Sequence, residues 1–293
     1  MTEPRVLEYP DPAAFLDATA TFRAAEPVFT NVIGSVAGSV LAGRTYESCR
    51  WMAVLDGTST VIGCAMRTAP WNLAVSPMPG PAAAAVGKHM AKADPLLPGI
   101  VGPRTVVDGV VDAAGWRARA RVNMDEIIRV LGRYTPSPAP AAGAARVATA
   151  GDRDLVLAWM FAFAEDAGLP AHGIPDGTDG QLDRGSLRLW EVDGTPVSMA
   201  GHAPVDPTPS GIVARVGPVY TPAALRGRGY GTAVTSAVVE GLLPTCAIIM
   251  LVTDADNATS NGVYARLGFV EAGALVEVLV DPPAHPPTTP PRP

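Results

Sequence analysis

The spacing of hydrophobic and polar residues predicts an α/β protein, because short apolar runs of strand length alternate with longer segments of helical length. In the first half, helices are expected over residues 11–25, 27–41, 81–93 and 103–114. Strands are expected over residues 50–55, 58–66, 73–76, 100–101 and 127–133. The pair Asp56-Gly57 predicts a tight hairpin between the first two of these strands.

The second half shows the same alternation. Helices are expected over residues 151–166, 232–243 and 258–267, and a loop over 166–180. Strands are expected over residues 146–149, 186–191, 196–203, 213–219, 247–253 and 268–280. The run 247–253 is apolar up to its final threonine, which is typical of a strand at the centre of a sheet.

A change of composition divides the chain. Residues 135–145 are rich in alternating proline and alanine and show neither the helical nor the strand periodicity of hydrophobic residues, which indicates a linker. We therefore expect a domain over 1–134, a linker over 135–145, a second domain over 146–280 and a proline-rich, extended and mobile tail over 281–293. The segments VLDGTSTVIGCAM and EVDGTPVSMAGHA suggest two copies of one unit, although two unrelated Asp-Gly hairpins would give the same pattern.

Composition narrows the class of protein and of partner. The chain has 293 residues, of which 48% are hydrophobic and 17% charged, with a formal net charge of -6. This balance fits a globular protein and argues against a nucleic-acid partner. The apolar stretch 31–43 is too short to span a bilayer, and the polar N-terminus does not resemble a secretion signal. We expect a cytoplasmic protein, either monomer or homodimer, without membrane association.

The three cysteines, Cys49, Cys64 and Cys246, do not have the spacing of metal ligands, so no metal site is expected. Cys64 and Cys246 stand in apolar runs, which favours buried, unreactive thiols. An odd cysteine count does not suggest a disulfide framework, in agreement with a reducing compartment.

The sequence Arg226-Gly227-Arg228-Gly229-Tyr230-Gly231 follows an expected strand and precedes an expected helix. Glycines at a helix start let backbone N–H groups approach an anion, and the helix dipole favours negative charge there. Arg-x-x-Gly-x-Gly alone is a weak signal, since a glycine turn that caps a helix looks the same. The surrounding elements make a phosphate site the stronger interpretation.

This loop resembles the pyrophosphate loop Q/R-x-x-G-x-G/A of the GNAT superfamily of acyl-CoA-dependent N-acetyltransferases. Asn257, Tyr264 and Gly268-Phe269 are similar to the family's downstream N-x(6)-Y-x(3)-G-F segment. The resemblance covers residues 146–280. It implies an α/β domain with a mixed, twisted sheet flanked by helices, and the similar order of elements in the first half indicates a second GNAT-like α/β domain of the same kind. The second sheet would be splayed between its fourth and fifth strands to admit acetyl-CoA, the cosubstrate.

The resemblance also implies roles for individual residues. The backbone at the strand end would pair with the pantetheine amides, the glycine loop would cradle the pyrophosphate, and Asn257 would hold the pantetheine arm. Tyr264 would be the catalytic acid that protonates the leaving thiolate. The implied acetyl-CoA-binding residues are Val219, Tyr220, Thr221, Arg226, Gly227, Arg228, Gly229, Tyr230, Gly231 and Asn257. The structural alternatives are a packed core tyrosine at Tyr264 and a simple helix cap at Asn257.

The chain departs from family members that carry a carboxylate on the fourth strand, because residues 213–219 contain none. A base, or a water chain to one, must take the proton of the attacking amine. The candidates are Glu165, Glu191, His202 and Asp254, and none is singled out. His202 near a strand end and Glu165 near a helix end also fit purely structural positions.

The first half lacks the phosphate loop. The segment Ser76-Pro77-Met78-Pro79-Gly80-Pro81 stands in its place, and proline removes N–H donors that a pyrophosphate requires. We expect a degenerate domain that shapes the substrate cleft or mediates assembly.

Three functions are compatible with these features. The first is direct transfer of an acetyl group to the amine of a small-molecule or peptide acceptor. The second is an acyl-CoA-binding sensor or assembly module without turnover. The third, a nucleotide-binding domain, requires an acidic ribose partner about 20 residues after the glycines. Glu240 comes too early for that role and falls within the expected helix.

Overall fold

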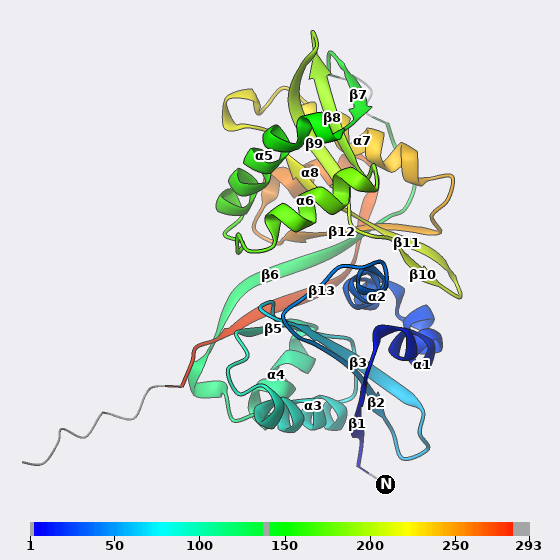
Figure 1. Cartoon of the computed structure of the whole chain (residues 1–293), viewed down its shortest axis with the longest axis vertical. Coiled ribbons are helices and arrows are strands. Elements are labelled where there is room, and N and C mark those ends of the chain that lie inside the picture. The colour runs from blue at the N-terminus through cyan, green and yellow to red at the C-terminus, as the bar shows by residue number, and fades with distance from the viewer. Residues whose placement is uncertain (1–2, 137–140, 284–293) are drawn as a thin grey trace, which may run out of the picture. The chain divides into compact units, whose positions relative to one another are not determined.

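The computed structural model describes residues 3–136 and 141–283 and shows two compact units (Figure 1). The first unit comprises residues 1–126 and 274–293, and the second comprises 127–273. The chain passes between the units inside two long strands, β6 (Ala120–Leu131) and β13 (Phe269–Val280). The expected boundaries at 134 and 146 differ from these limits, because both strands continue from one unit into the other.

The first unit follows the element order expected from its sequence, with one additional strand at its start. Its strands are β1 (Arg5–Tyr9), β2 (Cys49–Leu55), β3 (Val61–Thr68), β4 (Leu73–Val75) and β5 (Gly99–Gly102). Its helices are α1 (Pro12–Ala25), α2 (Pro27–Leu41), α3 (Gly80–Ala93), α4 (Arg104–Ala113) and the short η1 (Arg117–Arg119). The side chain of Asp11 accepts a hydrogen bond from the Ala14 amide at 2.9 Å, which confirms it as the cap of the first helix.

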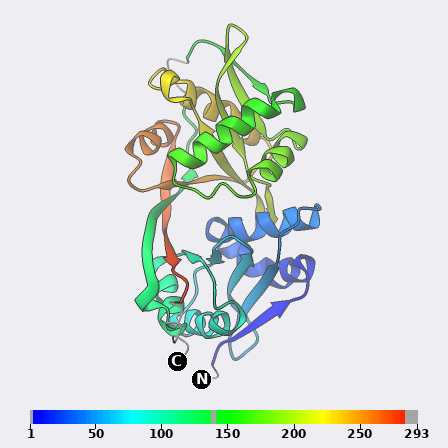
Figure 2. The same ribbon diagram turned by 60° about the vertical axis from the view of Figure 1, so that its left-hand side comes forward.

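The sheet of the first unit runs in the order β1-β2-β3-β4-β5 and continues into β13. Pairing is antiparallel except between β4 and β5, which are parallel. The end of β13 pairs antiparallel with β5, from Val276 opposite Gly102 to Leu279 opposite Gly99. Helices α1 and α2 enclose one core around Phe15 and Trp51, and α3 and α4 enclose another core with the valines of β13 (Figure 2).

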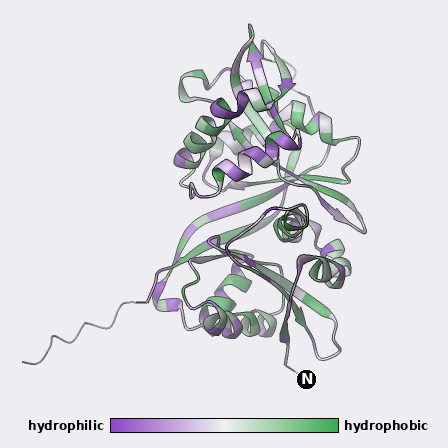
Figure 3. Cartoon of the chain, in the orientation of Figure 1, coloured by the Kyte–Doolittle hydropathy of each residue, from purple (hydrophilic) through white to green (hydrophobic). Residues whose placement is uncertain are grey.

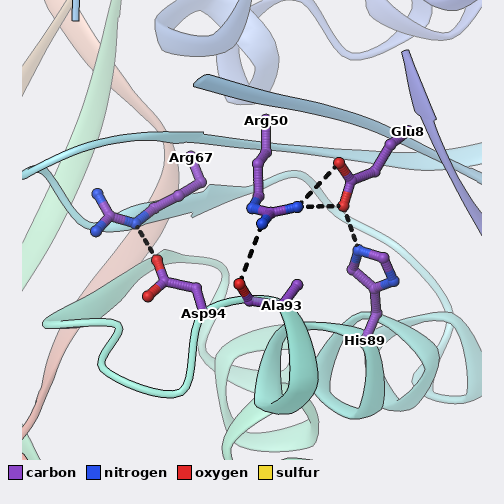
Figure 4. A network of polar contacts seen from close by, with 6 residues as sticks. All are labelled: Glu8, Arg50, Arg67, His89, Ala93 and Asp94. Carbon is purple, nitrogen blue, oxygen red and sulfur yellow. Dashed lines mark hydrogen bonds and ion pairs between the residues drawn. The ribbon is translucent and has the colours of Figure 1, made fainter. Parts of the chain in front are cut away.

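A polar network joins three strands of this unit to the end of α3 (Figure 4). Arg50 Nη1 donates to both carboxylate oxygens of Glu8, at 2.9 and 3.1 Å, and Nη2 donates to the Ala93 carbonyl. Glu8 also contacts His89 Nε2 at 2.6 Å. Cations beside the final carbonyls of a helix are favourable, so this cluster fixes the end of α3 on the sheet.

The second unit contains strands β7 (Ala144–Val147), β8 (Leu187–Val192), β9 (Thr195–His202), β10 (Asp206–Thr208), β11 (Gly211–Tyr220) and β12 (Ile248–Asp254). Its longer helices are α5 (Arg153–Asp166), α6 (Ile174–Asp183), α7 (Tyr230–Leu242) and α8 (Ala258–Arg266). The strand order is β7-β8-β9-β11-β12, with β6 beyond β12, and β10 pairs with β11. Two short 3₁₀ helices, η2 (Ala150–Asp152) and η3 (Ala223–Leu225), precede α5 and the glycine loop.

Helices cover both faces of this sheet. Val156 of α5 packs with Leu187, Leu189 and Met199 on one face. On the other face the apolar side of α7, including Val234 and Val238, forms the larger core with β11 and β12. The strands carry green, hydrophobic segments interrupted by purple, hydrophilic ones in Figure 3.

Three features differ from the sequence-based expectation. Residues 174–183 form helix α6, whereas a loop was expected because Pro175, Gly177 and Gly180 lower helix propensity. Strand β1 and the three-residue β10 were not expected. Part of the expected linker, 137–140, and most of the expected tail, 284–293, lie outside the described residues.

No helix in the described ranges combines the length and the hydropathy needed to cross a membrane.

Candidate functional site

The candidate site lies where β11 and β12 part. Their parallel register extends over three residue pairs, from Val213 opposite Ile248 to Arg215 opposite Met250. Beyond this point β11 keeps only its pairing with β9 on the opposite edge, with an irregularity between Val216 and Val219. A strand edge that leaves its neighbour presents backbone donors and acceptors to an extended ligand. The splay expected between the fourth and fifth strands of this sheet is therefore present.

The glycine loop lies directly beyond the end of β11 and leads into α7. Gly227 and Gly229 have positive φ values of 77° and 82°, which glycine adopts without strain. Gly229 is the N-cap of α7, and no side chain caps this helix end. The first N–H groups of α7, from Tyr230 and Gly231, are thus left for a ligand, and the dipole of the helix favours an anion.

The two arginines of the loop differ in their surroundings. Arg226 Nε donates to the Thr221 carbonyl at 2.9 Å, and its guanidinium forms an ion pair with Asp166 at the end of α5. The same guanidinium lies 5.8 Å from the centre of the Tyr220 ring. Arg226 therefore braces the loop with its side chain. Arg228 makes only a 3.5 Å contact with the Ala224 carbonyl and leaves its charge at the exposed surface.

The end of β11 is fixed from the side of β9. The buried Ser198 hydroxyl donates to the Tyr220 carbonyl at 2.9 Å and lies 2.8 Å from the Thr221 hydroxyl. The Tyr220 ring also packs on Trp159 of α5 at 6.2 Å between ring centres. Val219, Tyr220 and Thr221 thus hold a defined path along the opening.

Asn257 and Tyr264 both belong to α8, which follows β12. The Asn257 side chain accepts a hydrogen bond from the Ser260 amide at 3.0 Å, so it caps the helix and keeps its amide nitrogen for another partner. The Tyr264 ring contacts Phe269 edge-on, with ring centres 6.1 Å apart. Burial raises the pKa of the Tyr264 phenol to about 12, so Tyr264 is protonated at neutral pH.

The four candidate bases have different environments. Glu191 forms an ion pair with Arg146 at 2.7 Å, so its carboxylate already has a partner. Glu165 is exposed on α5. Burial lowers the pKa of His202, whose Nδ1 lies 2.8 Å from the Ala203 carbonyl, which leaves Nε2 as the basic nitrogen. Asp254 ends β12 and borders the opening directly.

A cavity of about 420 Å³ adjoins the glycine loop at Gly229. Its walls include Trp190 of β8 and Thr232, Ser236 and Glu240 on α7. Glu240 accepts a hydrogen bond from the Tyr134 hydroxyl at 2.6 Å. Arg266 also lines the cavity, so its wall carries one acidic and one basic side chain.

The first unit lacks both features of the site. Its parallel strands β4 and β5 stay together, and a Cβ atom placed on Gly102 would lie 2.4 Å from Val75 Cγ2. Pro79 is the N-cap of the adjoining helix α3, and Pro81 removes a further donor. Over the described ranges, no group of three or more potential metal ligands is found.

The fold and the site agree with comparisons to known proteins. Residues 158–269 match the model of the acetyltransferase (GNAT) family, a family of acyltransferases. This segment contains the opening, the glycine loop, Asn257 and Tyr264, and so forms a GNAT domain. A search of curated proteins finds no match.

Solved structures show the same arrangement over nearly the whole chain. A tandem GNAT protein from the clavulanic acid biosynthesis pathway is 14% identical, with a TM-score of 0.61, and the match covers 97% of this chain and 100% of that chain. A GNAT acetyltransferase from Colwellia psychrerythraea is 10% identical, with a TM-score of 0.59 over 94% and 99% of the two chains. A GCN5-related N-acetyltransferase from Sphaerobacter thermophilus is 16% identical, with a TM-score of 0.58 over 94% and 95%. The fold is thus that of two GNAT-like domains in tandem.

Several residues of the site carry no signal in the sequence. Ser198, Trp159 and Asp166 lie outside the two motifs, and only their contacts with Tyr220, Thr221 and Arg226 connect them to the site. The spacing of Trp159 and Asp166, two helical turns apart on α5, is consistent with one shared face but equally with ordinary packing.

Proposed function

We propose that the second unit transfers the acetyl group of acetyl-CoA directly to a primary amine. The observation that carries this proposal is the parting of β11 and β12 beside the uncapped start of α7. An extended pantetheine arm fits a strand edge, and a pyrophosphate fits a glycine loop at a helix N-terminus. Val219, Tyr220, Thr221, the amides of 226–231 and Asn257 would bind the cosubstrate.

The reaction requires two proton transfers. The nitrogen of the neutral amine attacks the thioester carbonyl, so that an N–C bond forms while the C–S bond breaks. The amine proton passes to a base or to water, and Tyr264 donates its phenolic proton to the departing sulfur, which yields the acetamide and free coenzyme A. Burial raises the pKa of the Tyr264 phenol, which makes it a weaker acid. The same surroundings would raise the pKa of the coenzyme A thiol as well, so the proton affinities of the phenolate and the thiolate stay comparable.

A thiol-release assay tests this function. The protein is incubated with acetyl-CoA and a panel of small-molecule and peptide amines, and free coenzyme A is measured. We expect amine-dependent release that falls in the Tyr264→Phe variant. If no amine in a broad panel stimulates release although acetyl-CoA binds, the proposal of catalysis is wrong.

A second candidate is an acyl-CoA-binding sensor or assembly module. It is favoured by one observation: β11 contains no carboxylate that would serve as the base. Binding of acetyl-CoA without turnover in the assay above would support it. The acceptor as a small-molecule or peptide amine, the cytoplasmic location, and the monomer or homodimer state stay predictions.

A further inference from the structure

Strand β6 brings a charged side chain from before the linker to α8 of the GNAT domain. Arg129 lies in the part of β6 that belongs to the second unit, where β6 follows β12 in the strand order. Its Nε donates to Asn261 Oδ1 at 3.1 Å. The contact spans 132 residues of sequence, so the GNAT domain includes a residue that the family segment 158–269 does not contain.

Asn261 relays this contact to the turn between β12 and α8. Its Nδ2 donates to the Asp254 carbonyl at 3.0 Å and to the Ala255 carbonyl at 3.3 Å. An arginine only donates, so Asn261 must turn its oxygen to Arg129 and its amide nitrogen to the two carbonyls. Arg129 therefore selects the orientation in which Asn261 closes this turn.

The turn determines where the two site residues of α8 stand. Asn261 follows Asn257 by four residues and precedes Tyr264 by three, so all three occupy one face of the helix. Asn257 and Asn261 are also linked directly, because the Asn261 amide donates to the Asn257 carbonyl at 3.0 Å. A displacement at Asn261 thus reaches both neighbours.

We propose that Arg129 is a positioning residue for the transferase site, which acts through Asn261 to hold the first turn of α8 and, with it, Asn257 and Tyr264. The effect of Arg129 on catalysis rests on the proposed function, whereas its contact with Asn261 is independent of that function. The contacts of Arg129 lead to α8 through Asn261 and the two carbonyls of the turn.

Hydrogen exchange on the full chain tests the structural part without reference to activity. Arg129→Met and Asn261→Ala should each raise amide exchange in residues 257–264 about tenfold, with α7 as the internal reference, and the double variant should show no further increase. Arg129→Lys, which keeps a donor, should restore part of the protection. Arg133→Met is the matched control, since it removes the same charge from an exposed position four residues away. Unchanged exchange in Arg129→Met would overturn the proposal.

Kinetics test the catalytic part. Loss of geometry by about 1 Å costs up to 100-fold in rate. Arg129→Met should therefore lower kcat by about 10- to 100-fold, Arg129→Lys should recover most of it, and Arg133→Met should retain the wild-type rate. Increased exchange with an unchanged kcat would contradict the positioning role. If the wild-type protein neither binds acetyl-CoA nor releases thiol, the proposed function is wrong, and the exchange data still decide whether Arg129 fixes α8.

Discussion

Tyr264 is held by packing, and its hydroxyl is the only part that the proposed mechanism uses. Its ring lies against Phe269 and joins the core formed by α7 and the strands. Phenylalanine at this position keeps the ring and loses the acid. The residue thus offers a substitution that separates catalysis from stability.

Tyr264→Phe should lower kcat by about 100-fold, within the range of a lost general acid, and leave acetyl-CoA binding nearly unchanged. Thiol release gives the rate, and calorimetry gives the dissociation constant. A variant that binds acetyl-CoA equally well and turns over at the wild-type rate would remove Tyr264 from the mechanism.

The pH dependence follows from the raised pKa of Tyr264. In the proposed mechanism the phenol is the proton donor, and burial holds its pKa at about 12, so the protonated form would persist through neutral and mildly alkaline pH. The rate should show no decline attributable to this group below about pH 11. The assay uses a saturating amount of an amine whose own pKa is near 7, so that the amine stays uncharged across the alkaline range. An alkaline limb near pH 10 that is absent from Tyr264→Phe would show an exposed phenol instead.

At the scale of elements, the sequence predicts a helix or strand correctly where a local cap or turn residue determines its start or end. The Asp11 cap and the two helices of 12–41 are confirmed, and so are the glycine loop and α7. Helix α6 is not predicted because its one proline and two glycines lower helix propensity, while packing on α5 stabilises it. The contact of Arg129 with Asn261 could not be predicted, because it depends on which strand follows β12.

The 3₁₀ helix η2, which leads directly into α5, begins with a charged capping box. Both amide and hydroxyl of Thr149 donate to Asp152, and Arg146 donates to both carboxylate oxygens at 2.7 Å. These contacts hold the pKa of Asp152 well below its usual range. The carboxylate therefore stabilises the fold above the unfolded pKa, about 4, and this contribution declines as the pH falls below it.

Asp152→Asn should lower the free energy of unfolding by about 1 kcal/mol at pH 7, a value near the lower end for charged hydrogen bonds because Arg146 is partly exposed. Urea unfolding at pH 7 and at pH 3 measures it. The difference from wild type should narrow at pH 3. A difference that stays constant between the two pH values would show that the charge of Asp152 does not matter.

At the scale of the whole molecule, the first unit is completed by a strand segment from the far end of the chain. Residues 274–280 of β13 follow the second unit in the sequence but belong to the first. The end of β13 pairs with β5 of the first unit, and Val276, Val278 and Val280 lie in its core. Asn72 donates to Glu277 at 2.6 Å on the same strand. The first 134 residues therefore lack part of their own sheet, which a division at the proline-rich linker does not reveal.

A chain that ends at Gly273 should consequently lose the first unit. Exposing three buried valines costs about 1.5–3 kcal/mol each, which is comparable to the stability of a domain. Thermal unfolding with hydrogen exchange should show 3–126 unprotected. A chain that ends at Pro283 keeps the whole of β13 and should unfold as wild type. Equal stability of both truncations would contradict the pairing.

Calorimetric titration of the full chain with acetyl-CoA tests the central claim most directly. Within residues 3–136 and 141–283, the strand opening and the uncapped glycine loop are found in the second unit alone, so binding of one molecule per chain is expected. Gly229→Glu should abolish it, because a side chain at positive φ distorts the loop and its carboxylate repels the pyrophosphate. Gly241→Ala, at the other end of α7, should bind as wild type. The absence of binding by the wild-type chain, or undiminished binding by Gly229→Glu, would contradict the account.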